Sequence, residues 1–192
     1  MTMAEKDKTD TSNYTWRELV AGDIAVWLKI WKPGWTPAQG IQLKDAVRLT
    51  WNYTGLRATL LYRLSHHLWL KHIPVLPGIL TRLNITLHGF DVPCIVKIGP
   101  GLYVPHPVGT VIMAQEIGAN VTLISGITIG MRNEPDFPLI GNNVFIGAGA
   151  RVLGNLVIGD NVNIGANAVV VKDIPANCTA VGIPAKILAN QA

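Results

Sequence analysis

Few side chains in this 192-residue sequence could act as a base, a nucleophile or a metal ligand. Cys94 and Cys178 stand far apart, and neither they nor the five histidines show the spacing of a metal site. We therefore expect two reduced cysteines that fill space, and no bound metal. His106, in the segment Val104-Pro-His-Pro-Val108, carries an imidazole that could take a proton from a hydroxyl group. On its own, a histidine in such a segment is typical of an ordinary surface residue.

A six-residue repeat surrounds His106 and must position it. The period fits neither a helix of about 3.6 residues per turn nor a meander of long strands. It fits short strands joined by tight turns, three to a coil of about 18 residues. The anchors are aliphatic, and each is followed four places later by a second small or aliphatic residue. They are Ile98 and Val104; Ile117, Leu123 and Ile129; and Ile140, Ile146, Val152, Ile158, Ile164 and Val170.

These coils predict a parallel β-helix from about Val92 to Val171, in which each anchor stacks on the one a coil later, such as Ile140 on Ile158. Full burial of one anchor contributes roughly 1.5–3 kcal/mol. Asparagine tolerates the backbone angles of tight corners, and we expect that role for Asn120, Asn143, Asn161 and Asn167.

The repeat is interrupted twice. One residue is added before Ile117, and five are added between Ile129 and Ile140. The second insertion, residues 131–139, should leave the β-helix as a loop. Loops on rigid scaffolds are where ligand contacts concentrate, although an idle insertion would look the same.

The first half of the chain shows helical patterning. A cap of helices could cover the open first coil, whose exposed edge would otherwise favour aggregation. We expect three domains or segments: a flexible tail at 1–14, an α-helical cap at 15–90, and a β-helix with a C-terminal tail at 91–192. The expected helices are Trp16–Leu28, begun by a Thr15/Glu18 capping box; two helices within Leu43–Leu70, meeting near Gly55; and a last helix ending about His88.

Composition separates the two halves. Residues 1–90 hold 11 Lys and Arg, 6 Asp and Glu and all six tryptophans, whereas residues 91–192 hold 5 basic and 6 acidic side chains. With 49 % apolar and 15 % charged residues the chain is globular, not disordered. It has no apolar run of membrane-span length and no signal-peptide pattern. We expect a cytoplasmic protein, also at the inner face of the membrane, with no nucleic-acid partner.

Several segments together resemble the serine acetyltransferase family. The resemblance covers roughly residues 53–190 and implies a left-handed parallel β-helix, a trimeric core with sites between subunits, and acetyl-CoA as donor. Larger assemblies, such as dimers of trimers, occur in that family through a longer helical domain than the one in this chain. The segments are Tyr62-Arg-Leu-Ser-His66, Gly89-Phe-Asp-Val-Pro93, Ile146-Gly-Ala-Gly-Ala-Arg-Val-Leu-Gly-Asn155, Ile164-Gly-Ala-Asn-Ala-Val169 and Val181-Gly-Ile-Pro-Ala-Lys186.

The resemblance implies that Asp91 and His106 are the catalytic dyad. A hydroxyl is a poor nucleophile at neutral pH, so a base must take its proton as it attacks a thioester. Neutral imidazole can do this, and a carboxylate on its other nitrogen fixes the tautomer and stabilises the imidazolium. In a coil of about 18 residues, a separation of 15 brings the two near one edge. His66 matches a helical-domain histidine of the family, for which we expect a structural role.

The same resemblance implies a groove for coenzyme A between subunits, where small residues let the ligand approach backbone amides. By position the cofactor-binding residues are Gly130, Ala148, Gly149 and Ala166, with Lys172 and Lys186 as candidate phosphate partners.

The acceptor pocket departs from the family. The family holds the carboxylate of serine with an Arg-His pair before a proline, but here Asp136 and Phe137 precede Pro138. An aspartate repels a carboxylate. The family's aspartate before the catalytic histidine is Pro105 here.

We therefore expect Asp136 and Phe137 to contact a different acceptor, namely the hydroxyl of a saccharide or polysaccharide precursor. Tryptophans of the basic first half could stack on sugars or contact a membrane, or simply pack between helices. The alternatives are a true serine O-acetyltransferase and a non-catalytic β-helix scaffold.

Overall fold

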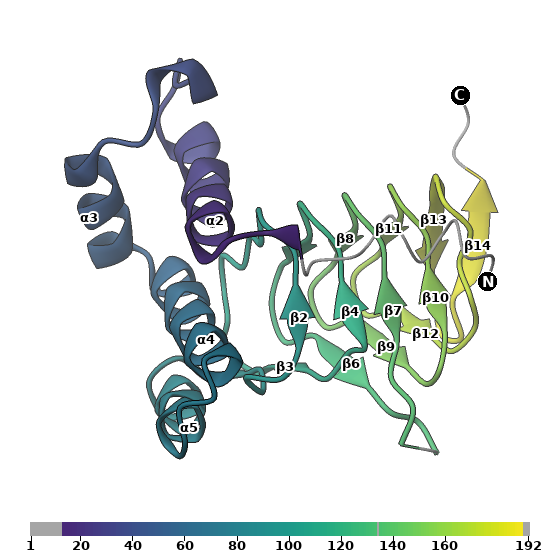
Figure 1. The fold of residues 1–192 in the computed structure, drawn as a ribbon. Helices are drawn as coiled ribbons and strands as arrows, with labels where there is room; N and C mark the ends of the chain where they lie inside the picture. Colours follow the sequence, from purple (N-terminus) through teal and green to yellow (C-terminus); the bar gives the residue numbers. More distant parts are fainter. Residues whose placement is uncertain (1–12, 134, 190–192) are drawn as a thin grey trace.

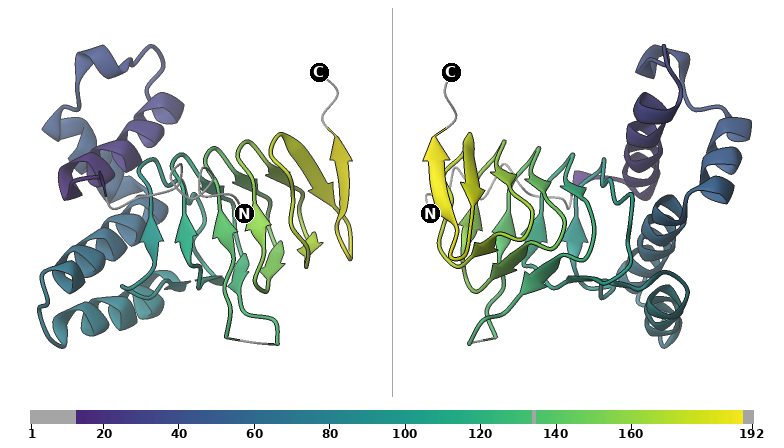
Figure 2. Two further views of the ribbon diagram at one scale, coloured as in Figure 1. Left: turned by 45° about the vertical axis from the view of Figure 1, so that its right-hand side comes forward. Right: turned by 180° about the vertical axis from the view of Figure 1, so that it is seen from behind.

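The computed structural model describes residues 13–133 and 135–189. Its second half is a parallel β-helix with three sheets as walls (Figures 1 and 2). The chain passes through sheet A, then sheet B, then sheet C, and returns to sheet A. Sheet A holds β1 (Phe90–Asp91), β3 (Thr110–Ile112), β6 (Thr128–Gly130), β9 (Arg151–Leu153) and β12 (Val169–Val170). Sheet B holds β2 (Lys97–Ile98), β4 (Glu116–Ile117), β7 (Leu139–Ile140) and β10 (Val157–Ile158). Sheet C holds β5 (Thr122–Leu123), β8 (Phe145–Ile146), β11 (Asn163–Ile164), β13 (Cys178–Val181) and β14 (Lys186–Ala189).

The predicted anchors form the interior columns of this β-helix. In sheet B, Ile98 pairs with Ile117, Ile117 with Ile140, and Ile140 with Ile158. The steps of 19, 23 and 18 residues confirm the one-residue and five-residue insertions. All eleven anchors are at least 99 % buried, so they supply a continuous apolar core.

An asparagine ladder runs along the corner between sheets B and C. Asn120, Asn143, Asn161 and Asn177 all have φ between 56° and 61°, a left-handed conformation that asparagine tolerates better than most residues. Each side-chain amide donates to the carbonyl oxygen of the next asparagine, at 3.2, 3.1 and 3.0 Å. Asn167, on another corner, also has a positive φ, which confirms the four asparagines expected at corners.

Four α-helices and one 3-10 helix form the cap. Thr15 and Glu18 make the predicted capping box, and the two central helices meet at Tyr53, two residues before the expected point. The first helix continues three residues beyond its predicted end, because the break comes only at the Lys32–Gly34 turn. The elements are α2 (Trp16–Trp31), η2 (Pro37–Gln39), α3 (Leu43–Asn52), α4 (Thr54–Leu70) and α5 (Leu76–His88). Residues 1–12 of the predicted tail lie outside the described residues.

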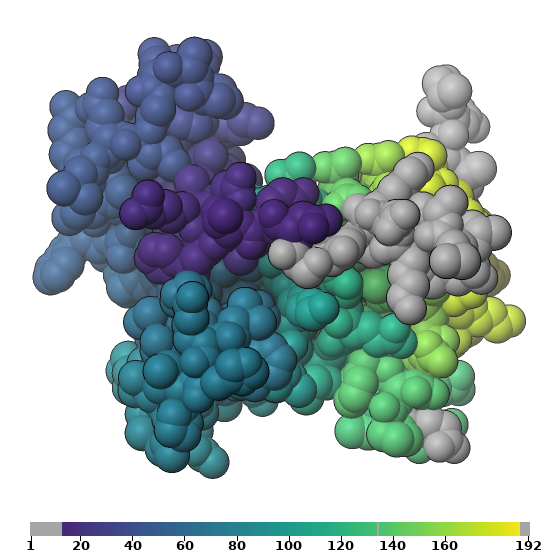
Figure 3. Space-filling model, in the orientation of Figure 1, coloured from purple at the N-terminus to yellow at the C-terminus, as the bar shows by residue number. Residues whose placement is uncertain are grey.

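The cap sits over the first coil, and a hairpin occupies the opposite end (Figures 1 and 3). Strand β14 pairs antiparallel with β13, so the C-terminal tail expected there forms a hairpin. Trp27 and Trp35 pack in the core of the cap, whereas Trp16, Trp31, Trp51 and Trp69 keep 38–83 % exposure. Among the described helices, none combines the length and hydropathy of a membrane span.

Candidate active site

His106 lies on the corner between sheets C and A in the first coil. Before it, Tyr103 bridges to Thr122 of sheet C, and after it β3 enters sheet A. The corner is closed by a turn in which the amide of Thr110 donates to the carbonyl of Pro107 at 3.0 Å. The His106 side chain is exposed. It is therefore held by a rigid turn and open to a ligand.

Helix α4 supports this corner from behind. Gly55 lies in its first turn, and a Cβ built there would stand 1.8 Å from the carbonyl oxygen of Val104 and 3.1 Å from that of Pro105. Glycine is required because any side chain would collide with main-chain atoms. This contact fixes the position of the segment that carries His106 relative to helix α4.

Asp91 lies on the outer face of β1, next to the inward-facing and buried Phe90. It is in register with Val111, 20 residues later and five beyond His106. The first coil is thus longer than the regular one. Asp91 lies on the wall beside the corner of His106, and His106 is five places short of the residue that stacks on Asp91. Neither side chain hydrogen-bonds to another residue in the described part of the chain.

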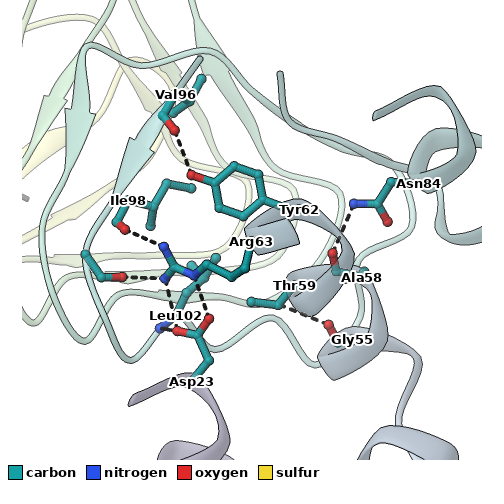
Figure 4. A network of polar contacts seen from close by, with 11 residues as sticks. Asp23, Gly55, Ala58, Thr59, Tyr62, Arg63, Asn84, Val96, Ile98 and Leu102 are labelled. Atoms are coloured by element: carbon teal, nitrogen blue, oxygen red, sulfur yellow. Dashed lines mark hydrogen bonds and ion pairs between the residues drawn. The ribbon is translucent and has the colours of Figure 1, made fainter. Parts of the chain in front are cut away.

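A fully buried ion pair joins the cap to the first coil (Figure 4). The Nε of Arg63 on α4 donates to Oδ2 of Asp23 on α2 at 2.8 Å, and Nη2 donates to Oδ1 at 3.0 Å. Arg63 also donates to the carbonyls of Ile98 and Gly99, while the amide of Leu102 donates to Asp23 at 2.8 Å. Two helices are therefore tied to the strand that leads to His106.

Both charges of this pair are compensated. Burial works to lower the pKa of Arg63, but the Asp23 carboxylate raises that pKa above its ordinary value, and the guanidinium stays charged. Burial raises the pKa of Asp23, although Arg63 and the amides of Leu102 and Gly101 oppose the rise. Tyr62, the residue before Arg63 on α4, donates its hydroxyl hydrogen to the carbonyl of Val96 at 2.7 Å. The side chains of Asp23, Tyr62 and Arg63 thus pair with protein groups, which indicates a structural role for this junction.

The helical-domain histidines also make structural contacts. His66 lies between the rings of Tyr62 and Trp69, and its Nδ1 is 2.6 Å from the carbonyl oxygen of Cys94. Burial lowers the pKa of His66. Nδ1 of His88 lies 2.7 Å from Oδ1 of Asn84, and burial, followed by the charge of Arg57, lowers its pKa as well.

Three predicted cofactor residues share the corner of His106 in later coils. Ala148 and Gly149 lie between β8 and β9, and Ala166 lies between β11 and β12, all three partly or fully exposed. Nη1 of Arg151 donates to the carbonyls of Gly126, Gly149 and Ala150, and so stiffens this corner. The result is a line of small residues leading along the β-helix towards His106.

The other predicted site residues lie elsewhere. Gly130 ends β6 and Lys172 follows β12, both at the corner between sheets A and B. The loop at 131–138 leaves from the same corner and projects from the β-helix (Figure 2). Asp136 on it is exposed and Phe137 half-buried. Lys186 is in β14, at the end of the molecule away from His106.

A pocket lies at the base of this loop. Gln115 holds the loop down, since its Nε2 donates to the carbonyl of Phe137 at 2.8 Å and to Oδ1 of Asn155 at 3.3 Å. The pocket presents both a cation and an anion, Arg132 and Asp136. Its lining is Arg132, Asn133, Asp136, Leu153, Gly154, Asn155, Leu156 and Val171.

The two halves of the predicted site are thus on different corners of one chain. The width of sheet A separates His106 and the line of small residues from the loop, Gly130 and Lys172. In the single chain these two groups of residues therefore do not meet.

Sequence reasoning missed several residues that shape this region. Arg132 lies in the same loop as Asp136 and Phe137, but the family resemblance concerns only the two residues before Pro138. Asp23 could have been noticed as an acid within the apolar stretch of α2. Gly55 and Gln115 carry no signal in the sequence, because their partners are distant along the chain. Within the described residues, no group of three or more His, Cys, Asp or Glu side chains could hold a metal ion.

Comparisons with known proteins agree with this architecture. Residues 137–172 match the model of the bacterial transferase hexapeptide family (six repeats). The chain is 40 % identical over 156 residues to a serine acetyltransferase of Helicobacter pylori, covering 77 % of this chain and 91 % of that protein. It is 39 % identical over 140 residues to the serine acetyltransferase of Synechococcus elongatus, covering 71 % of this chain but 57 % of that longer relative.

Solved structures of serine acetyltransferases superpose on this one. Soybean serine acetyltransferase in complex with serine matches with a TM-score of 0.77 at 29 % identity, covering 90 % of this chain and 69 % of that one. A serine acetyltransferase in complex with CoA matches with a TM-score of 0.76 at 30 % identity, covering 92 % and 71 %.

Proposed function

The chain belongs to the serine acetyltransferase family of acetyl-CoA-dependent O-acetyltransferases, and we propose that it transfers the acetyl group of acetyl-CoA to the hydroxyl of serine. The observation that carries the proposal is the exposed His106, held on a rigid corner in line with the small residues Ala148, Gly149 and Ala166. A base and a path for a thioester to reach it are the two requirements of this reaction.

In the proposed reaction, the imidazole of His106 takes the proton of the serine hydroxyl as that oxygen attacks the thioester carbon. The tetrahedral intermediate then collapses, the carbon–sulfur bond breaks, and the imidazolium returns the proton to the sulfur of coenzyme A. Asp91, on the wall beside the corner, stabilises the imidazolium. The products are O-acetylserine and free coenzyme A.

We propose that the functional unit is a homotrimer. Coenzyme A would run along the C–A corner of one chain, with Gly130, Lys172 and the loop at 131–138 supplied by its neighbour. This assignment follows from the separation of the two corners in the single chain. Lys186, in the terminal hairpin, would reach the far end of the coenzyme near its phosphates.

The two free cysteines suit a reducing compartment, and we propose a cytoplasmic location.

Arg132 removes the main objection to serine as the acceptor. Asp136 alone would repel the carboxylate of serine, but Arg132 lines the same pocket and presents a guanidinium, which pairs well with a carboxylate. Asp136 can then pair with the ammonium group of serine. The two charges of the amino acid thus meet two opposite charges in the pocket.

The experiment measures free thiol and O-acetylserine from acetyl-CoA and serine. We expect turnover by the wild type and a fall of about 10²- to 10⁴-fold in His106→Ala, the range for loss of a general base. His72→Asn, a change at an exposed histidine outside the site, is the matched control and should retain full activity. Absence of O-acetylserine with the wild type, or equal rates in His106→Ala, would overturn the proposal.

A saccharide hydroxyl is the second candidate acceptor, and an aromatic cluster near the site favours it. Trp31, 46 % exposed, stacks on Tyr53 with ring centroids 4.9 Å apart, and Tyr53 lies two residues before Gly55. Tyr103 belongs to the same cluster through Trp27 and lies three residues before His106. Exposed aromatic faces are suited to sugar rings.

The same assay separates the two candidates. Release of coenzyme A with sugar acceptors but not with serine, and its loss in Trp31→Ala but not in Trp69→Ala, would identify the saccharide. Turnover of serine that Trp31→Ala leaves unchanged would exclude a role for the cluster.

A further inference from the structure

Helix α3 turns an apolar stripe towards solvent. Leu43, Val47 and Trp51 are spaced four residues apart, on one face of the helix, and are 79, 59 and 83 % exposed. The opposite face buries only Asp45 and Leu49 against the rest of the cap. A helix that exposes more apolar surface than it buries is unusual in a soluble domain, so its outer face calls for a partner.

The charges around this stripe are all positive. Lys44 and Arg48 are exposed, each one residue after an apolar member of the stripe. Asp45, the one acid of α3, is buried on the inner face and paired with Lys32 at 2.6 Å. The stripe, defined as Leu43, Val47 and Trp51 with Lys44 and Arg48, therefore combines apolar and basic side chains with no anion.

We propose that this stripe docks on an anionic lipid surface. Tryptophan and aliphatic side chains enter the boundary between headgroups and acyl chains, while lysine and arginine reach anionic headgroups. Helix α3 forms an outer edge of the cap, at the end of the molecule opposite the hairpin (Figures 1 and 3).

Charge and area disfavour a second copy of the chain as the occupant. A two-fold contact through α3 would bring Lys44 and Arg48 close to the same residues of the partner, without an acid to pair with them. The area that three apolar side chains can bury is also well below the roughly 800 Å² per partner that a stable interface buries. A lipid surface needs neither a matching patch nor that area.

The experiment is co-sedimentation of the full chain with vesicles of phosphatidylcholine alone and of phosphatidylcholine mixed with phosphatidylglycerol. We expect binding to the mixed vesicles and much less to the neutral ones. The variant Val47→Ser/Trp51→Ser should lower the partition coefficient at least tenfold. Lys44→Gln and Arg48→Gln should each lower it about fivefold, corresponding to about 1 kcal/mol per basic residue.

Two matched controls test whether the effect belongs to α3. Ile183→Ser changes a side chain that is 74 % exposed in the terminal hairpin, and Arg82→Gln changes an exposed arginine on α5. Both should bind the mixed vesicles as the wild type does. All these positions are exposed, so unchanged thermal unfolding confirms that the variants fold.

The proposal is overturned by absence of binding to either vesicle, by equal binding to both, or by equal losses in the controls. It is also overturned if, without vesicles, sedimentation shows an assembly that Val47→Ser/Trp51→Ser dissociates, because the stripe would then join copies of the chain. Transfer of acetyl groups to a soluble acceptor should be unchanged in the α3 variants, so this test is independent of the proposed reaction.

Discussion

Gly55 of α4 lies so close to Val104 that a Cβ at position 55 would stand 1.8 Å from the Val104 carbonyl oxygen. The helical cap and the β-helix therefore meet through main-chain contact two residues before His106. Since interiors are close-packed, a displacement of one partner moves the other. The cap therefore determines where the corner of His106 lies.

Gly55→Ala should lower both stability and activity. The new methyl group must push α4 away from Val104, at a cost of about 1–3 kcal/mol, and the shift displaces His106. Urea unfolding and kcat measure the two effects. Gly78→Ala is the matched control, since the nearest atom to its Cβ is the end of Arg82 at 3.7 Å. In α5 this change should stabilise slightly, and equal effects of the two variants would contradict the prediction.

Removing one partner of the buried ion pair should be costly. Arg63→Met leaves Asp23 charged in the core and the carbonyls of Ile98 and Gly99 without their donor, so we expect a loss of about 3–5 kcal/mol. Asp23→Leu/Arg63→Met should lose clearly less than the sum of the two single changes. A double-mutant cycle from urea unfolding checks this, and additivity would show that the pair does not act as a unit.

The loop variants should distinguish serine from other acceptors. Arg132→Ala should raise KM for serine by at least tenfold with little change in KM for acetyl-CoA, because only the carboxylate contact is removed. Asp136→Asn should raise KM for serine as well, through the lost contact to the ammonium. If Asp136→Asn instead lowers KM for serine, Asp136 acts by repulsion and serine is the wrong acceptor.

Mixing two impaired variants should restore activity at low serine. His106→Ala removes the base of one corner, and Arg132→Ala damages the loop of the other, so a mixed trimer contains interfaces with both groups intact. At a serine concentration well below the KM of Arg132→Ala, we expect turnover after the two proteins are unfolded and refolded together to exceed the sum of the two refolded separately. Failure to recover activity in verified mixed trimers would place the whole site within one chain.

His66 should make stability depend on pH. Burial lowers its pKa in the folded chain below the ordinary value of 6.5, so the unfolded chain binds a proton first as the pH falls. Its contribution is complete above about pH 6.5 and is lost below it. His66→Asn keeps a donor near the Cys94 carbonyl but does not titrate.

The measurement is the urea midpoint between pH 8 and 5. The wild type should lose more stability than His66→Asn over the acid half of this range. Because His88 titrates in the same direction, only the difference between the two proteins reports on His66. Identical pH profiles would contradict the prediction.

The sequence predicts the β-helix well because its period is local. The eleven anchors predicted from the six-residue spacing are all buried, and the interruptions before Ile117 and Ile140 appear as steps of 19 and 23 residues in the structure. The spacing missed Ile112, which is buried and in register with Ile129 in sheet A. The first coil escaped this reasoning. Its strand β1 precedes the regular repeat, so the pairing of Asp91 with Val111 could not be counted from the spacing.

The site was less predictable than the scaffold, because it depends on long-range contacts. The family resemblance assigned roles to Asp91 and His106, which remain predictions. It did not show that Gly55 packs behind the corner, or that Gln115 holds Phe137 and Asn155 together. The sequence shows that Asp136 departs from the family pattern. Only the structure shows that Arg132 lines the same pocket as Asp136 and supplies a charge of the opposite sign.

The asparagine ladder allows the length of the β-helix to change by whole coils. Each side-chain amide of the ladder donates to the asparagine one coil later, so a chain with one coil more or one coil fewer can form the same bonds between successive rungs. One coil changes the length by about 4.8 Å. The reach from the corner of His106 to the terminal hairpin can therefore be adjusted in fixed steps, by whole coils, while the chemistry at the first coil stays as it is.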